Sequence, residues 1–188
     1  MNGSVFTMYL LNFIFIGLLP IFFFRRHGRL NIMWWVTAAP FFVCPLLLAM
    51  GFAGYIEPLG PEGWRTPLET ISVVPSMASI ALIFFTLGTH RTRLALWHQN
   101  DDAPRSIVTH GAYSRIRHPF YVSFIFAFAG AFVFFSHWGT FLILVYASVL
   151  LNFTAAKEEK RLGASEFGTD YQKYMNRTGR FWPQLSVR

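Results

Sequence analysis

The sequence predicts an all-α integral membrane protein with five transmembrane helices, a tight hairpin between the fourth and fifth, and a cytosolic C-terminal amphipathic helix. Hydrophobic residues make up 54% of the 188 residues and charged residues 13%, whereas a soluble domain carries about a quarter charged residues. The mean hydropathy is +0.40. The apolar residues are gathered in four long runs without formal charge, at residues 1–24, 30–56, 70–89 and 119–156.

These runs determine the expected helices. A membrane-spanning helix needs about 20 apolar residues. The first three runs therefore each hold one helix, expected at residues 5–24, 33–54 and 69–88. The last run has 38 residues and holds two short helices with a turn at residues 136–139. A cleaved signal peptide is not indicated, because no Lys or Arg precedes the first run.

The distribution of positive charge predicts the orientation. Lys and Arg collect on the cytoplasmic side of membrane proteins. Five crossings place segments 25–30, 90–118 and 157–188 on one side, and these hold every Lys and Arg except Arg65. We therefore expect the N-terminus outside and the C-terminus in the cytosol, in the inner (cytoplasmic) membrane if the protein is bacterial. The net charge of +7 then reflects topology and contact with anionic lipids, and no nucleic-acid partner is expected.

The chain is expected to form a single membrane domain, 1–188. Its parts are three helices in 1–88, a cytosolic loop at 89–118, the helical hairpin at 119–156 and a cytosolic C-terminal segment at 157–188. The loop is longer than a simple turn requires, and such loops are often functional. The sequence assigns no role to residues 98–106 within it and no oligomeric state to the chain.

The C-terminal segment carries the predicted amphipathic helix. Phe167, Tyr171 and Tyr174 recur there at helical spacing, and Gly179 is expected to stop the helix. Elsewhere, Cys44 stands alone in the second run. No His or Cys grouping has the spacing of a metal site, so no metal is expected.

A polar cluster, GAYSRIRHPFY at residues 111–121, lies at the mouth of the hairpin. The hairpin brings Arg117 and His118 towards Glu158 and Glu159 at its other end, and the tail can add Arg180. Separate roles are also consistent with the pattern: arginines as interfacial anchors, His118 as a helix-terminal residue, and glutamates paired with neighbouring Lys and Arg. Successive helix residues point about 100° apart, so the two glutamates are expected to differ in role.

Two stretches carry a resemblance to a known family. They are IVTHGAYSRIRHPFY, residues 107–121, and EEKRLGASEFGTDYQKYMNRTGRFWP, residues 158–183, on either side of the hydrophobic hairpin. In this order they resemble the isoprenylcysteine carboxyl methyltransferase family, in a compact microbial form, and the related phospholipid N-methyltransferases. The resemblance implies an integral membrane enzyme that uses S-adenosyl-L-methionine. It also implies a lipophilic or membrane-associated acceptor, methylated on O, N or S at the cytosolic membrane face.

The resemblance assigns roles to individual residues. It places on the cofactor side Gly111, Tyr113, Arg117, His118, Pro119, Tyr121, Glu158 and Glu159. It implies catalytic roles for Glu158, Glu159 and Arg180. The chemistry suits these roles, because a glutamate can pair with the ammonium of the cofactor, an arginine with its carboxylate, and aromatic rings with adenine and sulfonium.

The acceptor and the reaction class leave alternatives open. An ionised carboxylate or thiolate needs no base, whereas an amine needs one, for which Glu158 or Glu159 is the candidate. One alternative is an NADPH-dependent membrane reductase of the sterol-reductase type. Such an enzyme is expected to have more membrane spans and additional basic residues than this chain has. The other is a non-catalytic membrane assembly or sensor protein. The sequence does not identify the acceptor, the atom methylated, or the glutamate that faces the cofactor.

Overall fold

The computed structural model describes residues 1–22, 32–89 and 107–184, and every regular element in those ranges is helical. The elements are α1 (Gly3–Phe22), α2 (Ile32–Phe52), η1 (Glu62–Trp64), α3 (Arg65–Thr89), η2 (Gly111–Ser114), α4 (Pro119–Phe134), α5 (Trp138–Gly163) and α6 (Gly168–Met175). The predicted all-helical architecture is confirmed for the described residues.

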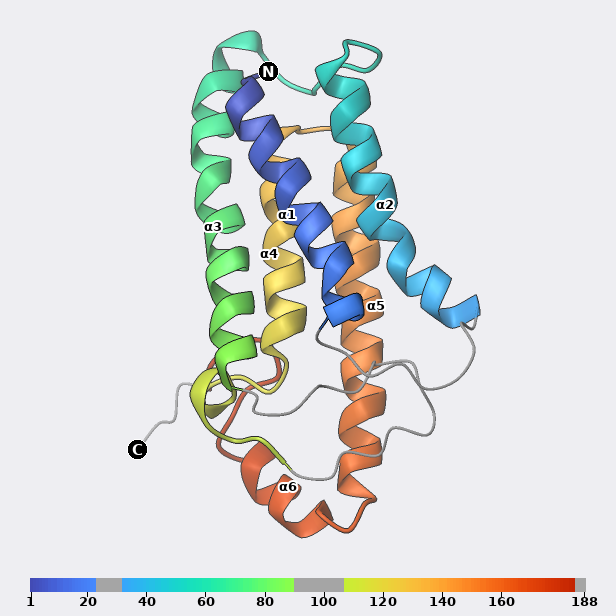
Figure 1. Cartoon of the computed structure of the whole chain (residues 1–188), viewed down its shortest axis with the longest axis vertical. Helices are drawn as coiled ribbons and strands as arrows, with labels where there is room; N and C mark the ends of the chain where they lie inside the picture. Colours follow the sequence, from blue (N-terminus) through green and yellow to red (C-terminus); the bar gives the residue numbers. More distant parts are fainter. Residues whose placement is uncertain (23–31, 90–106, 185–188) are drawn as a thin grey trace.

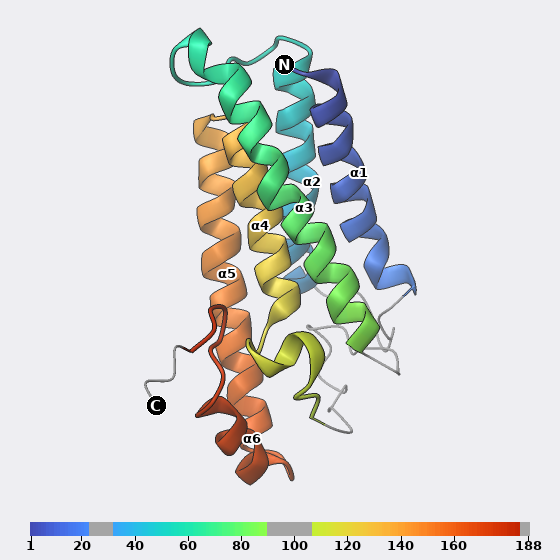
Figure 2. The ribbon, with the colours of Figure 1, turned by 90° about the vertical axis from the view of Figure 1, so that its left-hand side faces the viewer.

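The long helices α1 to α5 run along the long axis of the molecule and alternate in direction (Figure 1). The N-terminus and the connection between α2 and α3 lie at one end. The turn η2 and helix α6 lie at the other end, beside the last turns of α5 (Figure 2). Segments far apart in the sequence are therefore gathered at the α6 end.

Small residues allow α3, α4 and α1 to pack closely. Ser72, Ser76 and Ser79 of α3 are fully buried. A Cβ on Gly130 of α4 would lie 2.5 Å from the Tyr9 hydroxyl and 3.3 Å from the Ser72 carbonyl oxygen. The Tyr9 hydroxyl donates a hydrogen bond of 2.6 Å to that same carbonyl. Glycine at position 130 thus lets α4 fit between α1 and α3.

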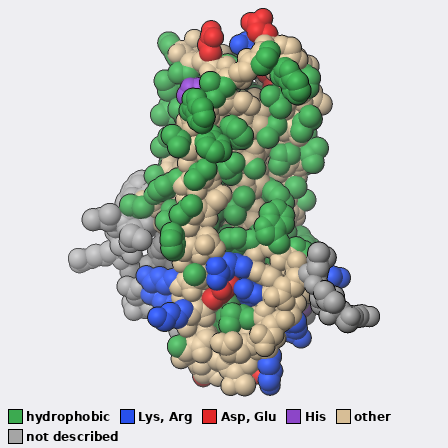
Figure 3. Space-filling model, turned by 180° about the vertical axis from the view of Figure 1, so that it is seen from behind, with side chains coloured by type: hydrophobic (Ala, Val, Ile, Leu, Met, Phe, Trp, Pro, Cys, Tyr) green, Lys and Arg blue, Asp and Glu red, His purple; other side chains and the backbone are tan. Residues whose placement is uncertain are grey.

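On the face shown in Figure 3, hydrophobic side chains cover the middle of the molecule, and charged side chains gather towards its two ends. Among the large apolar side chains that stay exposed are Val74 of α3 and Leu142 and Phe153 of α5. A soluble monomer rarely exposes a continuous apolar surface of this extent. This exposed apolar surface around the middle of the molecule, the apolar belt, therefore indicates a lipid environment.

Two helical segments of the described chain are long and apolar enough to cross a membrane, Glu62–Thr89 and Trp138–Gly163. Three further apolar helices are shorter, at Gly3–Leu19, Val36–Phe52 and Pro119–Phe134. The membrane character of the fold follows from these helices and the apolar belt. The number of crossings, five, stays a prediction.

The unequal lengths of α4 and α5 position the candidate site. Residues 135–137 join the two helices, of which α4 has 16 residues and α5 has 26. The final turns of α5 therefore extend beyond the first residue of α4 and lie beside the loop that precedes it. Those turns, residues 157–163, carry charge and follow the apolar part of α5, which ends at Ala156. Glu158 and Glu159 are thus outside the apolar belt and next to the loop.

Candidate active site

The loop before α4 is shaped by Gly111 and Pro119. Gly111 has a φ of +59°, and a Cβ there would overlap the side chain of Thr89 at the end of α3. Glycine tolerates both this backbone conformation and this contact. Pro119 occupies the first turn of α4, where its missing N–H costs nothing, and His118 is the N-cap residue. Both ends of the loop are therefore held against helices.

The C-terminal tail pairs with this loop through its backbone. The N–H of Arg117 donates to the Gly179 carbonyl at 2.8 Å, and the N–H of His118 donates to the Arg180 carbonyl at 3.2 Å. The hydroxyl of Tyr174 in α6 donates to the Tyr113 carbonyl at 2.7 Å. The predicted amphipathic helix thus ends at Met175, earlier than expected, because the following residues pair with the loop instead.

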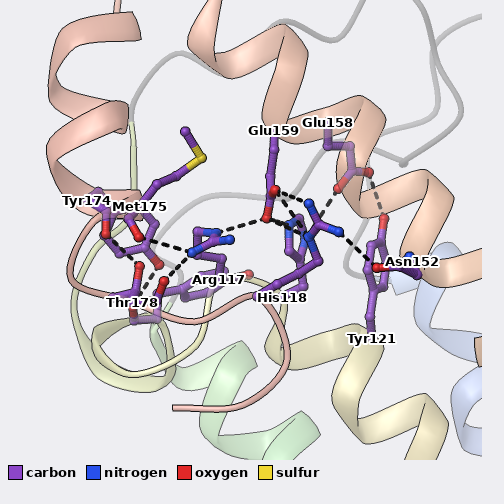
Figure 4. A network of polar contacts seen from close by, with 11 residues as sticks. Arg117, His118, Tyr121, Asn152, Glu158, Glu159, Tyr174, Met175 and Thr178 are labelled. Carbon is purple, nitrogen blue, oxygen red and sulfur yellow. Dashed lines mark hydrogen bonds and ion pairs between the residues drawn. The ribbon is translucent and has the colours of Figure 1, made fainter. Parts of the chain in front are cut away.

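Glu159 is the centre of a network of charged side chains (Figure 4). Its Oε1 accepts a hydrogen bond from Arg117 Nε at 2.8 Å and lies 3.2 Å from His118 Nε2. Its Oε2 accepts a hydrogen bond of 2.6 Å from Arg180 Nη2, and Arg180 Nε lies 3.2 Å from both carboxylate oxygens. The Glu159 side chain is 8% exposed. The end of α5, the loop and the tail therefore meet on one buried carboxylate.

The two arginines have further partners. Arg117 Nη1 donates to the carbonyl oxygens of Thr178 and Met175. Arg180 Nη1 donates to Asn152 Oδ1 at 2.9 Å. The Arg117 side chain is 10% exposed, whereas that of Arg180 is 33% exposed. Arg180 is therefore the arginine that a molecule from outside reaches more readily.

Glu158 has different surroundings from its neighbour. Its Oε1 accepts a hydrogen bond of 2.6 Å from the Tyr121 hydroxyl, and its Oε2 lies 3.5 Å from His118 Nδ1. The Tyr121 and His118 rings stack with centroids 5.2 Å apart. His118 thus lies between the two glutamates, with one ring nitrogen towards each.

The surroundings shift the pKa values of the two carboxyl groups in opposite directions. Burial alone would raise the pKa of Glu159, but hydrogen bonds from His118, Arg180 and Arg117 together hold it well below its usual range. Burial raises the pKa of Glu158 to about 7, against the opposing effects of the Tyr121 hydrogen bond and the Arg161 charge.

The neutral form of the histidine between them is favoured. Burial lowers the pKa of His118 below its usual value, although its hydrogen bond to Glu159 acts in the opposite direction. Two guanidinium groups therefore face one carboxylate whose pKa lies well below its usual range. The surplus positive charge favours an anionic ligand group, and the partly exposed Arg180 is the residue to receive it.

The structure brings together six of the predicted site residues: Arg117, His118, Tyr121, Glu158, Glu159 and Arg180. The other three have supporting contacts. Gly111 lies against Thr89, Pro119 is buried at the start of α4, and Tyr113 offers its carbonyl to Tyr174.

Sequence reasoning missed Asn152, although a signal was available. Asn152 precedes Glu159 by seven residues, so two turns of α5 place both on the same side. The carbonyls of Thr178 and Met175 carried no such signal, because backbone acceptors are not visible in residue types. The segment 98–106 lies outside the described residues.

Fold and site together define an apolar helical bundle with an ionic cluster at one end. The model of the isoprenylcysteine carboxyl methyltransferase (ICMT) family matches residues 70–164, just over half of the chain. The chain therefore belongs to this family of membrane methyltransferases. The match contains Arg117, His118, Glu158 and Glu159 and ends before Arg180. None of the curated proteins compared with the chain is similar enough in sequence to count as a match.

Proposed function

We propose that this protein is an S-adenosyl-L-methionine-dependent methyltransferase that modifies a lipophilic or membrane-associated small molecule on O, N or S. The observation that carries the proposal is the cluster in which Arg117, His118 and Arg180 surround Glu159 at the end of an apolar bundle. Membership of the family supplies the reaction class, methyl transfer.

The cluster fits the charged groups of the proposed cofactor. S-adenosyl-L-methionine would supply a methyl group activated by its sulfonium, and it also carries an ammonium, a carboxylate and an adenine. An amino-acid end suits the Arg180–Glu159 pair, because its carboxylate matches the guanidinium and its ammonium the glutamate. The stacked rings of Tyr121 and His118 offer the aromatic surface that adenine or a sulfonium favours.

The proposed roles of the residues follow from these contacts. We assign to the cofactor site Gly111, Tyr113, Arg117, His118, Pro119, Tyr121, Glu158 and Glu159, and to catalysis Glu158, Glu159 and Arg180. Methyl transfer is an in-line displacement, so these residues contribute mainly by aligning the reactants and excluding water. Gly111 and Pro119 contribute by fixing the loop that carries Arg117 and His118.

The proposed topology places this site at the cytosolic face of a single membrane domain. Over their full lengths α1 and α2 have 20 and 21 residues, close to the roughly 20 that one crossing needs, whereas α4 has 16 and requires local thinning of the bilayer. Five crossings leave Glu57, Glu62, Arg65 and Glu69 outside with the N-terminus. A lipophilic acceptor would then reach the site from the adjoining bilayer.

The experiment that tests the proposal is calorimetric binding of S-adenosylhomocysteine, and separately of NADPH, to the detergent-purified protein. Glu159→Gln removes the charge that holds both arginines. Glu166→Gln is the matched control, because Glu166 is exposed and outside the cluster. The proposal predicts micromolar binding of S-adenosylhomocysteine that is lost in Glu159→Gln and kept in Glu166→Gln.

The two alternatives predict other outcomes. Binding of NADPH alone would establish the reductase. Binding of neither compound by folded wild-type protein would favour the non-catalytic assembly or sensor role.

A further inference from the structure

Glu158 and Glu159 are neighbours in the sequence but differ in their partners. Glu159 accepts hydrogen bonds from two guanidinium groups, whereas the Glu158 oxygens contact the Tyr121 hydroxyl and the His118 ring, and Arg161 acts on them through its charge. Such a pair of carboxyl groups in contrasting environments is the usual basis for separate acid–base roles.

The orientation of the His118 ring determines whether the protonated or the ionised form of Glu158 is favoured. Glu159 is ionised and can only accept, so His118 Nε2, 3.2 Å away, must carry the ring proton. The other nitrogen of a neutral imidazole, Nδ1, then presents a lone pair. That lone pair faces Glu158 Oε2 at 3.5 Å, an arrangement that favours a proton on this oxygen.

The second oxygen of Glu158 is consistent with the same assignment. Oε1 accepts a hydrogen bond of 2.6 Å from the Tyr121 hydroxyl, so Oε2, which faces the His118 Nδ1 lone pair, is the oxygen to which we assign the proton. The Glu158 side chain is 27% exposed, so a molecule entering the site can approach it. Glu158 therefore combines a proton-accepting oxygen with access from outside.

Other titratable groups lie near Glu158, and of these Arg161, Glu159 and Tyr121 modify its pKa. The nearby groups are Arg161 and Glu159 on its own helix, Tyr121 on α4, His118 and Tyr113 on the loop, and Tyr171 on α6. Burial is the largest influence and raises the pKa of Glu158 to about 7. A base with a pKa near the working pH is well suited to proton transfer.

We propose that Glu158 accepts the proton released by the methyl acceptor, and that the acceptor is therefore an amine or a thiol whose nucleophilic atom enters protonated. This inference rests on the proposed methyltransferase function and names its acceptor class. An acceptor carboxylate, already ionised at neutral pH, would leave Glu158 without a proton to accept.

The reaction balances without a further reactant. The lone pair of the acceptor nitrogen or sulfur forms a bond to the methyl carbon, while the bond from that carbon to the sulfonium sulfur of the methyl donor breaks. The sulfur keeps the bonding electrons and becomes a neutral thioether. The acceptor proton passes to Glu158 Oε2, which faces His118 Nδ1, and then to solvent.

The first test follows the proton on Glu158 in the ligand-free protein. Infrared difference spectra between about pH 5 and about pH 9 should show a protonated carboxyl band lost near the pH set by the Glu158 pKa of about 7. This band should be absent from Glu158→Gln and present in Glu166→Gln. A spectrum with no such difference between wild type and Glu158→Gln would overturn the proposal.

The second test separates proton acceptance from binding. Glutamine keeps an oxygen for Tyr121 and offers an N–H to His118 Nδ1, so Glu158→Gln imitates the protonated form. Because its proposed contribution to the cofactor site needs only this uncharged form, the variant should bind S-adenosylhomocysteine within about threefold of wild type, yet methylate a lipophilic amine or thiol on the order of 100-fold more slowly. With wild type, this rate should rise tenfold per pH unit below about pH 7 and then level off.

The opposing outcomes are distinct. Loss of S-adenosylhomocysteine binding in Glu158→Gln would show that the cofactor needs the ionised carboxylate of Glu158, and would overturn the proposal. Methylation of an S-prenylated cysteine carboxylate, undiminished in Glu158→Gln, would overturn it as well. Failure of wild type to bind S-adenosylhomocysteine would instead reject the proposed function on which the inference rests.

Discussion

Arg180 Nη2 lies 2.6 Å from Glu159 Oε2, although the two residues are 21 positions apart and belong to the tail and to α5. The backbone carbonyl of Arg180 also accepts a hydrogen bond from the His118 N–H. One residue of the tail is therefore bound to both sides of the candidate site. The arrangement of the site residues therefore depends on the attachment of the C-terminal tail.

Glu159→Gln is expected to destabilise the protein. It removes the charge that compensates Arg117 and Arg180, of which Arg117 is mostly buried. Breaking one side of a buried ion pair costs about 3 kcal/mol, so the unfolding temperature in detergent should fall by several degrees. Glu166→Gln, on an exposed carboxylate, should leave it unchanged. Equal unfolding temperatures for the two variants would contradict a structural role of the cluster.

The pH dependence of stability should reveal the two glutamates separately. Glu159 has a lowered pKa, so its contribution is present above the unfolded-state pKa and is lost as the pH falls through its folded pKa. Glu158 has a raised pKa of about 7, so its contribution is present below the unfolded-state pKa and is lost as the pH rises through 7. Glu158→Gln should therefore flatten the decline in unfolding temperature between about pH 5 and about pH 8. An unchanged slope in Glu158→Gln would show that another group titrates there.

Much of this arrangement was predictable because hydropathy and charge are patterned along the chain. Apolar run lengths identified the helices, and the order of α4 and α5 placed Arg117 and His118 near the two glutamates. The distinction between Glu158 and Glu159 was not predictable in detail, since helical geometry gives only their different directions. It depends on the position of the His118 ring between them.

The tail was the least predictable part. Its aromatic spacing indicated a helix as far as Gly179, but α6 ends at Met175. The backbone groups of Gly179 and Arg180 pair with Arg117 and His118 instead, and such long-range pairing has no local sequence signal.

Gly179→Ala should detach the tail from the loop. A Cβ at this position would overlap the carbonyl oxygen of Trp182, which is backbone and cannot move aside as a flexible side chain does. The expected cost is about 1–3 kcal/mol, with faster proteolysis after the end of α6. Gly163→Ala is the matched control, because its Cβ would make an ordinary contact of 3.6 Å with Gln172 Nε2. Similar proteolysis of the two variants would show that the turn at Gly179 does not hold the tail.

Tyr174→Phe should weaken the contact between α6 and the loop. The Tyr174 hydroxyl donates to the Tyr113 carbonyl at 2.7 Å, and loss of such a bond costs about 1 kcal/mol. Tyr171 is equally buried in the same helix, but its hydroxyl makes no hydrogen bond to the described part of the chain. Tyr171→Phe should therefore lower the unfolding temperature less than Tyr174→Phe does. The reverse order would contradict the importance of this hydrogen bond.

The orientation in the membrane can be tested by labelling two exposed carboxylate positions. Glu62 precedes α3 at one end of the bundle and Glu166 precedes α6 at the other, and both are exposed. With the N-terminus outside, Glu62→Cys should react with a membrane-impermeant maleimide on intact cells, whereas Glu166→Cys should react only after permeabilisation. The native Cys44 is 1% exposed, so wild-type protein should give no background. Labelling of Glu166→Cys on intact cells would place the ionic cluster outside, where S-adenosyl-L-methionine is not made, and would argue against the proposed function.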